Sequence, residues 1–357
     1  MELNGKGVDE AWGVISSTID RVQKAHVPMT DGRKKGTRRP IWMDDTTLKK
    51  VRKKHGAFKR YRESLEGKDY LEYAKLRNQA KWACRAAVLD FEKKLASETN
   101  ANPKAFYKYV WSKMKTKETI GNLKSKQGFT VYTDEEKANA LNEKFSSVFT
   151  EEDVNNLPTP PHYDHIGEIT NIFFTTEAVE KKFAELNPNK APGPDGLHPR
   201  ILREMSHELA EPFTLLFKLS HDQGKLPGDW KRANVTPIFK KGSKADPGNY
   251  RPVNLTSTAC KVMEAIIREQ LMDHIKTALS QHQHGFVPGH SCTTNLLTAV
   301  DQWTKAMEDA IPIDAVYLDF RKAFDTVPHT GLAMKLESMG VSGRTLSWIQ
   351  DFLAGRL

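Results

Sequence analysis

A short apolar run followed by a carboxylate limits the possible fold and function of this chain more than any other stretch. Residues 315–318, AVYL, are rich in β formers and predict a buried strand, with Asp319 at its C-terminal end. Strand ends are where α/β sheets place their chemistry, because the next turn carries the backbone away and leaves the side chain facing a crevice. The residues that follow, FRKAFD, add two cations and two aromatic rings. The stretch 315–327 therefore predicts a site for a metal-bound phosphate ligand.

Composition narrows the class of protein. A chain of 357 residues has room for about two or three domains, and its 38% hydrophobic and 28% charged residues suit a soluble globular protein. No stretch reaches the roughly 18 apolar residues of a membrane span, and the N-terminus lacks a signal-peptide pattern. The three cysteines, Cys84, Cys260 and Cys292, lie far apart, which argues against a disulfide framework and fits a reducing compartment. We expect no membrane association and a nuclear and/or cytoplasmic location.

The positive charge is concentrated in the first third of the chain. Residues 1–130 hold 30 Lys and Arg against 15 Asp and Glu, whereas residues 131–357 hold 24 against 30, which gives +15 and −6. The first third is thus the better electrostatic match for a polyanion such as nucleic acid. Its basic runs at 33–39 and 49–54 fit nucleic-acid binding or nuclear import, although such runs are more often exposed charge on a helix or linker.

Helical periodicity and capping signals organise most of the chain. Residues 71–95 predict one long amphipathic helix, Asn102-Pro103 a helix start, and Thr133 with Glu136 a capping box. The helix after Pro103 interleaves aromatics with lysines, which fits base stacking and, more commonly, core packing. Further helices are expected over residues 177–186, 199–221, 256–278, 295–307, 329–339 and 344–353, a strand over 234–240, and a Pro-rich boundary at 157–162.

Four motifs follow one another in a fixed order. They are KAPGPDGLHPRIL (190–202), WKRANVTPIFKKGSKADPGNYRPVNLTS (230–257), HGFVPGHSCTTNLL (284–297) and VYLDFRKAFDTVPH (316–329). This series resembles the reverse transcriptases of non-LTR retrotransposons, especially the jockey-like group. The resemblance covers roughly residues 180–357. Residues 40–160 are similar, through weaker motifs, to the helical stretch that precedes the polymerase domain in such elements.

The resemblance implies an α+β fold built as part of a right-hand polymerase. Four segments are expected: a basic, mostly helical N-terminal extension (1–130), a helix with the Pro-rich boundary (131–170), the fingers (171–314) and the first part of the palm (315–357). The implied activity is RNA-directed DNA polymerisation, with an RNA template, a DNA primer and dNTPs as partners. Transfer of a nucleotide uses two Mg²⁺ ions, and Mg²⁺ prefers carboxylate and phosphate oxygens.

The same resemblance assigns roles around the nucleotide. Asp319 would be the catalytic metal ligand, and the carbonyl of Phe320 a further ligand. Phe324 would stack under the incoming sugar and exclude a 2′-hydroxyl, although a lone aromatic is by default a core residue. Arg251 would clamp the triphosphate, a task suited to a planar and permanently charged fork. Lys240 and Lys241 fit equally well as its partner, and the alternative is a hairpin with a solvated basic tip.

Two glycine-containing loops are template-contact candidates. The first loop, at 190–196, contributes Lys190, Gly193 and Gly196, whose glycines allow close backbone approach to the template or to neighbouring elements, and a mostly structural role is expected there. The second loop matches a family loop that lies along the template strand, and contributes Gly285, Phe286 and Gly289. Val287 stands where family members usually carry arginine, so a direct phosphate contact at that position is not expected.

Two clusters imitate functional motifs. Asp44-Asp45 in WMDD resembles the Y-x-D-D that supplies the other catalytic carboxylates, but it precedes the fingers and no apolar strand follows it. Four residues, His282, His284, His290 and Cys292, lie close together in sequence without paired zinc-ligand spacing. We expect neither cluster to bind a catalytic metal.

The sequence contains no Y-x-D-D, no primer grip and no thumb, and nothing resembling an endonuclease or RNase H site. One aspartate cannot hold two Mg²⁺ ions, so we expect a truncated copy or partial gene product without polymerase activity of its own. The alternatives are a non-catalytic RNA- or DNA-binding remnant of such an element, and a pseudogene product without function. The sequence leaves the template, the insertion target and the oligomeric state open.

Overall fold

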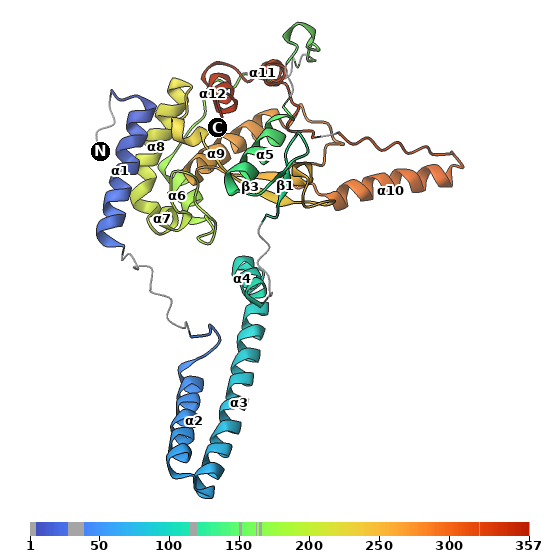
Figure 1. The fold of residues 1–357 in the computed structure, drawn as a ribbon. Helices are drawn as coiled ribbons and strands as arrows, with labels where there is room; N and C mark the ends of the chain where they lie inside the picture. The colour runs from blue at the N-terminus through green and yellow to red at the C-terminus, as the bar shows by residue number, and fades with distance from the viewer. Residues whose placement is uncertain are drawn as a thin grey trace. The chain divides into compact units, whose positions relative to one another are not determined.

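The computed structural model describes residues 5–27, 39–113, 120–149, 152–161, 163, 166–320 and 322–356. The chain forms two compact units (Figure 1): the main unit, Met1–Gln23 with Ile120–Leu357, and the helical unit, Lys24–Thr119. The basic run at residues 33–39 lies mostly outside the described residues. In the described part of the chain, no helix combines the length and the apolar character that a bilayer crossing requires.

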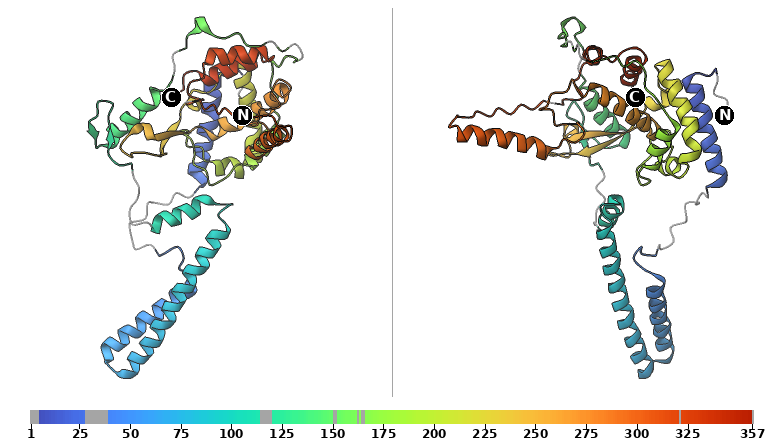
Figure 2. Two further views of the ribbon diagram at one scale, coloured as in Figure 1. Left: turned by 90° about the vertical axis from the view of Figure 1, so that its right-hand side faces the viewer. Right: turned by 180° about the vertical axis from the view of Figure 1, so that it is seen from behind.

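The helical unit is built on a hairpin of two helices, α2 (Asp45–Ser64) and α3 (Gly67–Ser97). Leu65, in the left-handed conformation at φ 54°, ends α2, and the chain reverses there (Figure 2). The helices pack through aromatic pairs such as Phe58 with Tyr73, whose ring centroids lie 5.0 Å apart. The predicted long helix is confirmed. Asp44 caps α2 by accepting a 2.6 Å hydrogen bond from the Thr47 amide, which gives the WMDD motif a structural role.

The third helix of this unit, α4 (Pro103–Lys113), starts where the sequence predicts it. Asn102 accepts a hydrogen bond from the Ala105 amide at 3.2 Å and so caps the helix. Tyr109 packs against α3, where its hydroxyl donates to Glu92 at 2.6 Å. No described residue of α4 is buried, and Trp111 is 64% exposed. Within the described residues the helix therefore has no core of its own, and base stacking on its aromatics stays a prediction.

Helices form the core of the main unit. Its central helix, α8 (Ser206–Gln223), packs against α6 (Thr176–Ala184), and α6 in turn contacts α9 (Thr258–Ile275). Phe183 and Phe213 meet edge to face with ring centroids 5.1 Å apart, and both are fully buried. Burial of each such ring contributes about 2–3 kcal/mol, so the aromatic cluster adds substantially to the stability of the unit.

The first helix of the chain, α1 (Val8–His26), belongs to this core rather than to the basic extension. Trp12 is buried against Trp230, with ring centroids 5.3 Å apart, and its indole N–H donates to Asp229 at 3.0 Å. Asp9 accepts a 2.7 Å hydrogen bond from the Gly228 amide. Helix α1 thus completes a helical core whose other members lie about 200 residues later in the sequence. The predicted functional boundaries at 130, 170 and 314 stay predictions.

The helix predicted over residues 199–221 is two helices. The first, α7 (Pro199–Glu204), ends at Met205, whose φ of −111° and ψ of 30° lie outside the helical region, and α8 begins at Ser206. The expectation of one continuous helix is therefore wrong, because hydrophobic periodicity runs through a single non-helical residue without a break. Gly224, at φ 60°, then ends α8 as a left-handed cap.

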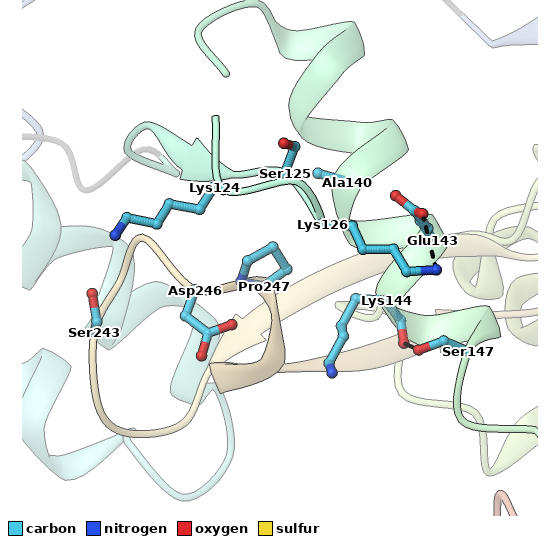
Figure 3. Close-up of a pocket in the computed structure, with 11 residues that line it drawn as sticks. Lys124, Ser125, Lys126, Ala140, Glu143, Lys144, Ser147, Ser243, Asp246 and Pro247 are labelled. Carbon is cyan, nitrogen blue, oxygen red and sulfur yellow. Dashed lines mark hydrogen bonds and ion pairs between the residues drawn. The ribbon is translucent and has the colours of Figure 1, made fainter. Parts of the chain in front are cut away.

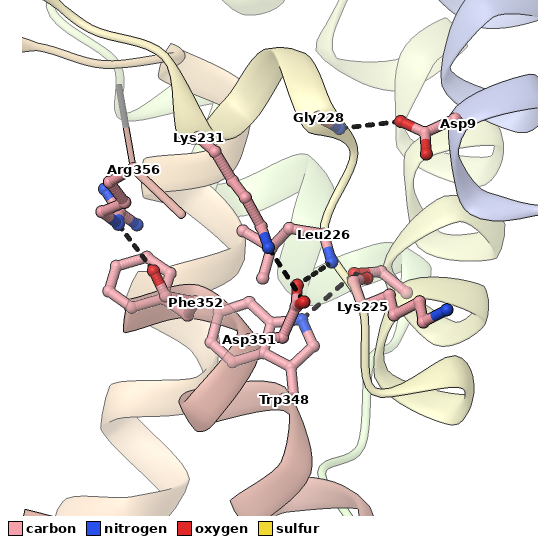
Figure 4. Close-up of polar contacts among 10 residues, drawn as sticks. Asp9, Lys225, Leu226, Gly228, Lys231, Trp348, Asp351, Phe352 and Arg356 are labelled. Atoms are coloured by element: carbon pink, nitrogen blue, oxygen red, sulfur yellow. Dashed lines mark hydrogen bonds and ion pairs between the residues drawn. The ribbon is translucent and has the colours of Figure 1, made fainter. Parts of the chain in front are cut away.

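The C-terminal helix, α12 (Gly343–Leu353), contacts α8 and the turn after it through hydrogen bonds and an ion pair (Figure 4). Asp351 accepts 2.8 Å bonds from the Leu226 amide and from the ammonium group of Lys231. The indole N–H of Trp348 donates to the Ser220 hydroxyl at 3.1 Å. These contacts satisfy polar groups that packing of the helix removes from water.

A buried histidine in the same interface gives a pH prediction. His221 lies 3.1 Å from the Thr345 hydroxyl, and burial lowers its pKa below the usual 6.5, although the nearby Asp222 carboxylate opposes this. The unfolded chain therefore binds the proton more readily than the folded chain. The contribution of neutral His221 to the free energy of unfolding is fully present above about pH 6.5, and it is lost as the pH falls through the pKa of His221 in the folded chain.

We expect the urea midpoint of the main unit to fall between pH 7.5 and 5.5, and the fall to be smaller in His221→Gln. The control is His207→Gln, which removes an exposed histidine of the same helix. An equal fall in wild type and His221→Gln would contradict the assignment.

Strands are few in the described residues. A small hairpin pairs β1 (Leu123–Lys124) with β2 (Thr130–Val131), and a longer one pairs β3 (Asn234–Phe239) with β4 (Tyr250–Leu255), both antiparallel. Helix α5 (Asp134–Ser146) follows β2 and begins with the predicted capping box. The observed fold is mixed and helix-rich, as an α+β class requires.

The buried strand predicted at 315–318 is wrong. Residues 311–320 form neither helix nor strand, and Leu318 is 84% exposed. A strand needs a hydrogen-bonding partner, and no described segment pairs with this one. It returns from the end of α10 (Cys292–Glu308), which extends away from the core and buries none of its described residues (Figure 1). Beyond it, α11 (His329–Ser338) begins where Glu152 accepts hydrogen bonds from the His329 and Thr330 amides.

Candidate functional site

The β3–β4 hairpin carries the predicted triphosphate ligands. Ile238 pairs with Arg251 and Phe239 with Tyr250, so the two pairs face opposite sides of the hairpin. Phe239 and Tyr250 pack together, ring centroids 5.6 Å apart, in a small core with Leu123 and Leu141. Arg251 consequently lies on the face away from this core and is exposed to solvent.

Lys240 and Lys241 begin the loop that joins the two strands. The Lys240 amide donates to the Asn249 carbonyl at 2.8 Å and closes the loop at its base. Gly242 needs its glycine, because its φ is +86° and a Cβ there would lie 2.7 Å from the amide nitrogen of the Asn249 side chain. Both lysine side chains are exposed. The hairpin thus presents two ammonium groups and one guanidinium from a loop and strand of fixed geometry.

The first glycine-containing loop is attached to the end of β4. A Cβ on Gly193 would lie 2.7 Å from the Ser257 nitrogen and from the carbonyl carbon and oxygen of Thr256. Ser257 is in turn the N-cap of α9. The close approach that this glycine permits is therefore to the protein backbone, which agrees with the expected structural role. Gly196, at φ +69°, turns the chain at the end of the loop, and Lys190 is exposed at its start.

Asp195 lies half-buried in the same loop. One carboxylate oxygen accepts a 3.3 Å hydrogen bond from the Leu197 amide, and burial raises the pKa of this carboxyl although a hydrogen bond with Ser257 opposes the shift. The sequence motif APGPDG contains the residue, but only its burial distinguishes it from the exposed aspartates of other loops. Asp195 and Gly193 together tie the loop to the junction between β4 and α9.

Two predicted residues from different motifs meet. The rings of Phe286 and Phe324 lie edge to face with centroids 5.7 Å apart at an interplanar angle of 89°. Phe286 adopts φ 62° beside Gly285, and Gly289 turns the same loop at φ +81°. Phe324 is 78% exposed, so it is not the core residue that a lone aromatic suggests by default. Its role at the sugar stays a prediction.

Asp319 and Phe320 lie in the extended segment that follows α10. Phe320 is 79% exposed. Within the described residues, no group of three His, Cys, Asp or Glu side chains is placed to hold a metal ion. The rings of His284 and His290 lie tilted by 36° with centroids 4.8 Å apart, and each ring nitrogen Nδ1 lies near a protein oxygen. These ring nitrogens therefore take part in hydrogen bonds within the loop and with the start of α10.

Comparison with known proteins bears on the motif series. Residues 238–357 match the family described as reverse transcriptase (RNA-dependent DNA polymerase). The chain is 32% identical over 168 residues, 46% of its length, to the RNA-directed DNA polymerase from mobile element jockey of Drosophila melanogaster. This chain carries a reverse transcriptase segment of the jockey-like, non-LTR kind.

Other relatives extend the similarity of this reverse transcriptase segment. The Pol polyprotein from type-1 retrotransposable element R1 of Bradysia coprophila is 25% identical over 279 residues, 75% of this chain. The Pol polyprotein from element R2 of Popillia japonica is 28% identical over 164 residues, or 46% of this chain. The chain spans only 18% of the jockey polymerase, 26% of the R1 protein and 22% of the R2 protein.

Proposed function

We propose that this chain forms part of an RNA-directed DNA polymerase and binds an RNA template, a DNA primer and the triphosphate of a dNTP. The observation that carries the proposal is the β3–β4 hairpin at the start of the matched reverse transcriptase segment, which presents Lys240, Lys241 and Arg251 from one rigid loop and strand. Guanidinium and ammonium groups are suited to phosphate oxygens, and the arginine adds a planar fork that can bind two of them at once.

Asp319 is the residue that would hold Mg²⁺ in this proposal. A two-metal centre needs several carboxylate oxygens, and no group of three His, Cys, Asp or Glu side chains among the described residues could hold a metal ion. These residues alone therefore do not fit the metal pair. Bound Mg²⁺ would supply charge stabilisation to the transferred phosphoryl group, whereas this chain would supply the triphosphate clamp and the sugar contact at Phe324.

A primer-extension assay tests the activity of these 357 residues. We expect no Mg²⁺-dependent dNTP incorporation on an RNA template, together with RNA binding that weakens steeply as salt is raised. Incorporation by this polypeptide would overturn the expected inactivity. Absence of both incorporation and RNA binding would overturn the proposed function.

The second candidate function is a non-catalytic nucleic-acid-binding protein, which the charge of the helical unit favours. Residues 45–113 hold 18 Lys and Arg against 8 Asp and Glu, a net charge of +10. A dNTP that binds in competition with inorganic triphosphate would support the polymerase origin of the site, whereas RNA binding without any dNTP binding would favour this second function.

Replacing Arg251 with lysine tests the triphosphate clamp. The change keeps the positive charge and removes the planar fork, so we expect the affinity for a fluorescent dNTP to fall about tenfold, and further in Arg251→Gln. The matched control is Arg268→Lys, which alters an exposed arginine of α9. Equal affinities of Arg251→Lys and wild type, measured by titration at fixed ionic strength, would exclude Arg251 as the clamp.

A further inference from the structure

A pocket of about 520 Å³ lies between two segments that are far apart in sequence (Figure 3). One wall comes from the β1–β2 turn and α5, through Lys124, Lys126 and Lys144. The other wall is the loop between β3 and β4, through Ser243 and Asp246. The first wall precedes the matched reverse transcriptase segment, which begins at residue 238. The pocket therefore lies between the β3–β4 hairpin and a segment, the β1–β2 turn with α5, that the family match does not include.

The two walls are held together tightly. The Lys124 amide donates to the Ala245 carbonyl at 2.8 Å, which attaches β1 to the loop directly. The hydroxyl of Tyr250 donates to the Lys244 carbonyl at 2.7 Å, and its ring belongs to the small core with Leu123 and Leu141. A pocket built on backbone bonds and a shared core keeps its shape without a ligand, which lowers the entropy cost of binding.

The charged side chains of the lining include three lysines and two acidic residues. Neither Lys124 nor Lys144 forms an ion pair with any residue that the structure describes. Lys126 pairs with Glu143 at 3.8 Å, but the two side chains are 75% and 48% exposed, so the pair is weak. The carboxylate of Asp246 already accepts a 2.8 Å hydrogen bond from the Gly248 amide. The lining thus carries a net charge of +1, and two of its three ammonium groups have no acidic partner among the described residues.

The polar groups of the wall match an anion with several oxygens. Figure 3 shows the amino groups of Lys124 and Lys144 on either side of Asp246 and Pro247. The hydroxyl of Ser125 is buried in the wall without a hydrogen-bond partner among the described residues. The loop that supplies Asp246 and Pro247 to the pocket begins with Lys240 and Lys241. The positive charge therefore continues from the pocket along the β3–β4 loop.

We propose that this pocket binds phosphate groups, through Lys124 and Lys144 with Lys126 in support, and that they belong to the phosphodiester backbone of a nucleic-acid strand held beside the β3–β4 hairpin. The proposal rests on the proposed function and extends it to residues outside the matched segment. A backbone ligand fits three spaced ammonium groups, because each can neutralise a different phosphate along the strand. The other source of the same chemistry is the triphosphate of a free nucleotide.

Lysine footprinting separates these sources. The full chain is acetylated with a limiting reagent, alone, with a single-stranded RNA 20-mer, or with dATP, and the modification of each lysine is measured by mass spectrometry. We expect the RNA to lower modification of Lys124 and Lys144 at least threefold and dATP to leave it unchanged. Exposed Lys218 on α8 is the internal control and should react equally in all three samples.

The outcomes are distinguishable. Protection of Lys240 and Lys241 without protection of Lys124 and Lys144 would overturn the pocket and leave the proposed function standing. Protection of the pocket lysines by dATP as well as RNA would show a nucleotide-phosphate site and overturn the backbone assignment. Protection at neither set by either ligand would overturn both proposals.

Substitution gives an independent readout. In Lys124→Gln and Lys144→Gln, we expect the slope of log affinity for the RNA against log salt concentration to become shallower by roughly 0.7 for each phosphate that the variant no longer neutralises. Lys218→Gln makes the same change in net charge outside the pocket and should leave the slope unaltered. Thermal melting of each variant confirms that it is folded. The same change in slope in Lys218→Gln would show that the effect comes from general surface charge and would overturn the pocket as a specific phosphate site.

Discussion

Replacing Trp12 with alanine is expected to destabilise the main unit by about 3–5 kcal/mol, the range for removing a buried large aromatic ring. Trp12 is 3% exposed and its ring contacts those of Phe213 and Trp230. The substitution leaves a cavity between these rings and also removes the donor to the Asp229 carboxylate. Both consequences act on the helical core that also contains Trp348 of α12.

Hydrogen exchange read by mass spectrometry measures this destabilisation within the correct unit. We expect peptides of α8 to exchange faster in Trp12→Ala by a factor that corresponds to the decrease in stability, whereas peptides of α2 and α3 keep their rates. The matched control is Trp82→Ala, because Trp82 is 67% exposed on α3 and its removal should cost under about 1 kcal/mol. Unchanged exchange in α8 after Trp12→Ala would show that α1 is not part of the core.

The position of α1 could not be predicted from charge or local pattern. The sequence places residues 1–130 together because they are basic, whereas α1 buries Ala11, Trp12 and Ile15 in the main core. An amphipathic helix shows that it has an apolar face, but its sequence does not state which distant surface covers that face. The partners of α1 lie about 200 residues away, beyond the reach of any local signal.

Elements specified by nearby residues were predictable. The capping box of Thr133 and Glu136 and the helix start at Asn102-Pro103 depend on contacts within a few residues. The strand at Asn234–Phe239 pairs with Tyr250–Leu255, the next strand along the chain. The order of the four motifs likewise predicted the reverse transcriptase resemblance that the comparisons confirm. Capping signals and motif order can both be read directly from the sequence, so predicting them does not require knowledge of tertiary contacts.

The candidate site was predictable as residue types but not as an assembled geometry. Residues 315–318 have strand composition, yet a strand forms only where a partner supplies its hydrogen bonds, and this segment stays extended and exposed. The meeting of Phe286 with Phe324 brings together loops that lie 38 residues apart. The lysine pocket was missed for the same reason, since its walls are about 100 residues apart in the sequence.

Gly193 provides the sharpest test of how the glycine-containing loop is positioned. An alanine Cβ at this residue would lie 2.7 Å from three backbone atoms of Thr256 and Ser257, a separation that real Cβ atoms essentially never show. Neither partner can rotate away, because Thr256 follows β4 directly and the Ser257 side chain caps α9 through the Cys260 amide. The loop must therefore move as a whole, at a cost of about 1–3 kcal/mol.

We expect Gly193→Ala to raise hydrogen exchange at the amides of residues 190–197 and in the first turn of α9, and to lower the melting temperature of the main unit. Gly121→Ala is the control, because its Cβ meets nothing within 4 Å and should change stability by less than about 0.5 kcal/mol. If displacement of the loop also weakens dNTP binding at Arg251, the loop and the hairpin act as one unit through the end of β4. Normal dNTP affinity in a destabilised Gly193→Ala would show instead that the loop supports the fold without positioning the triphosphate clamp.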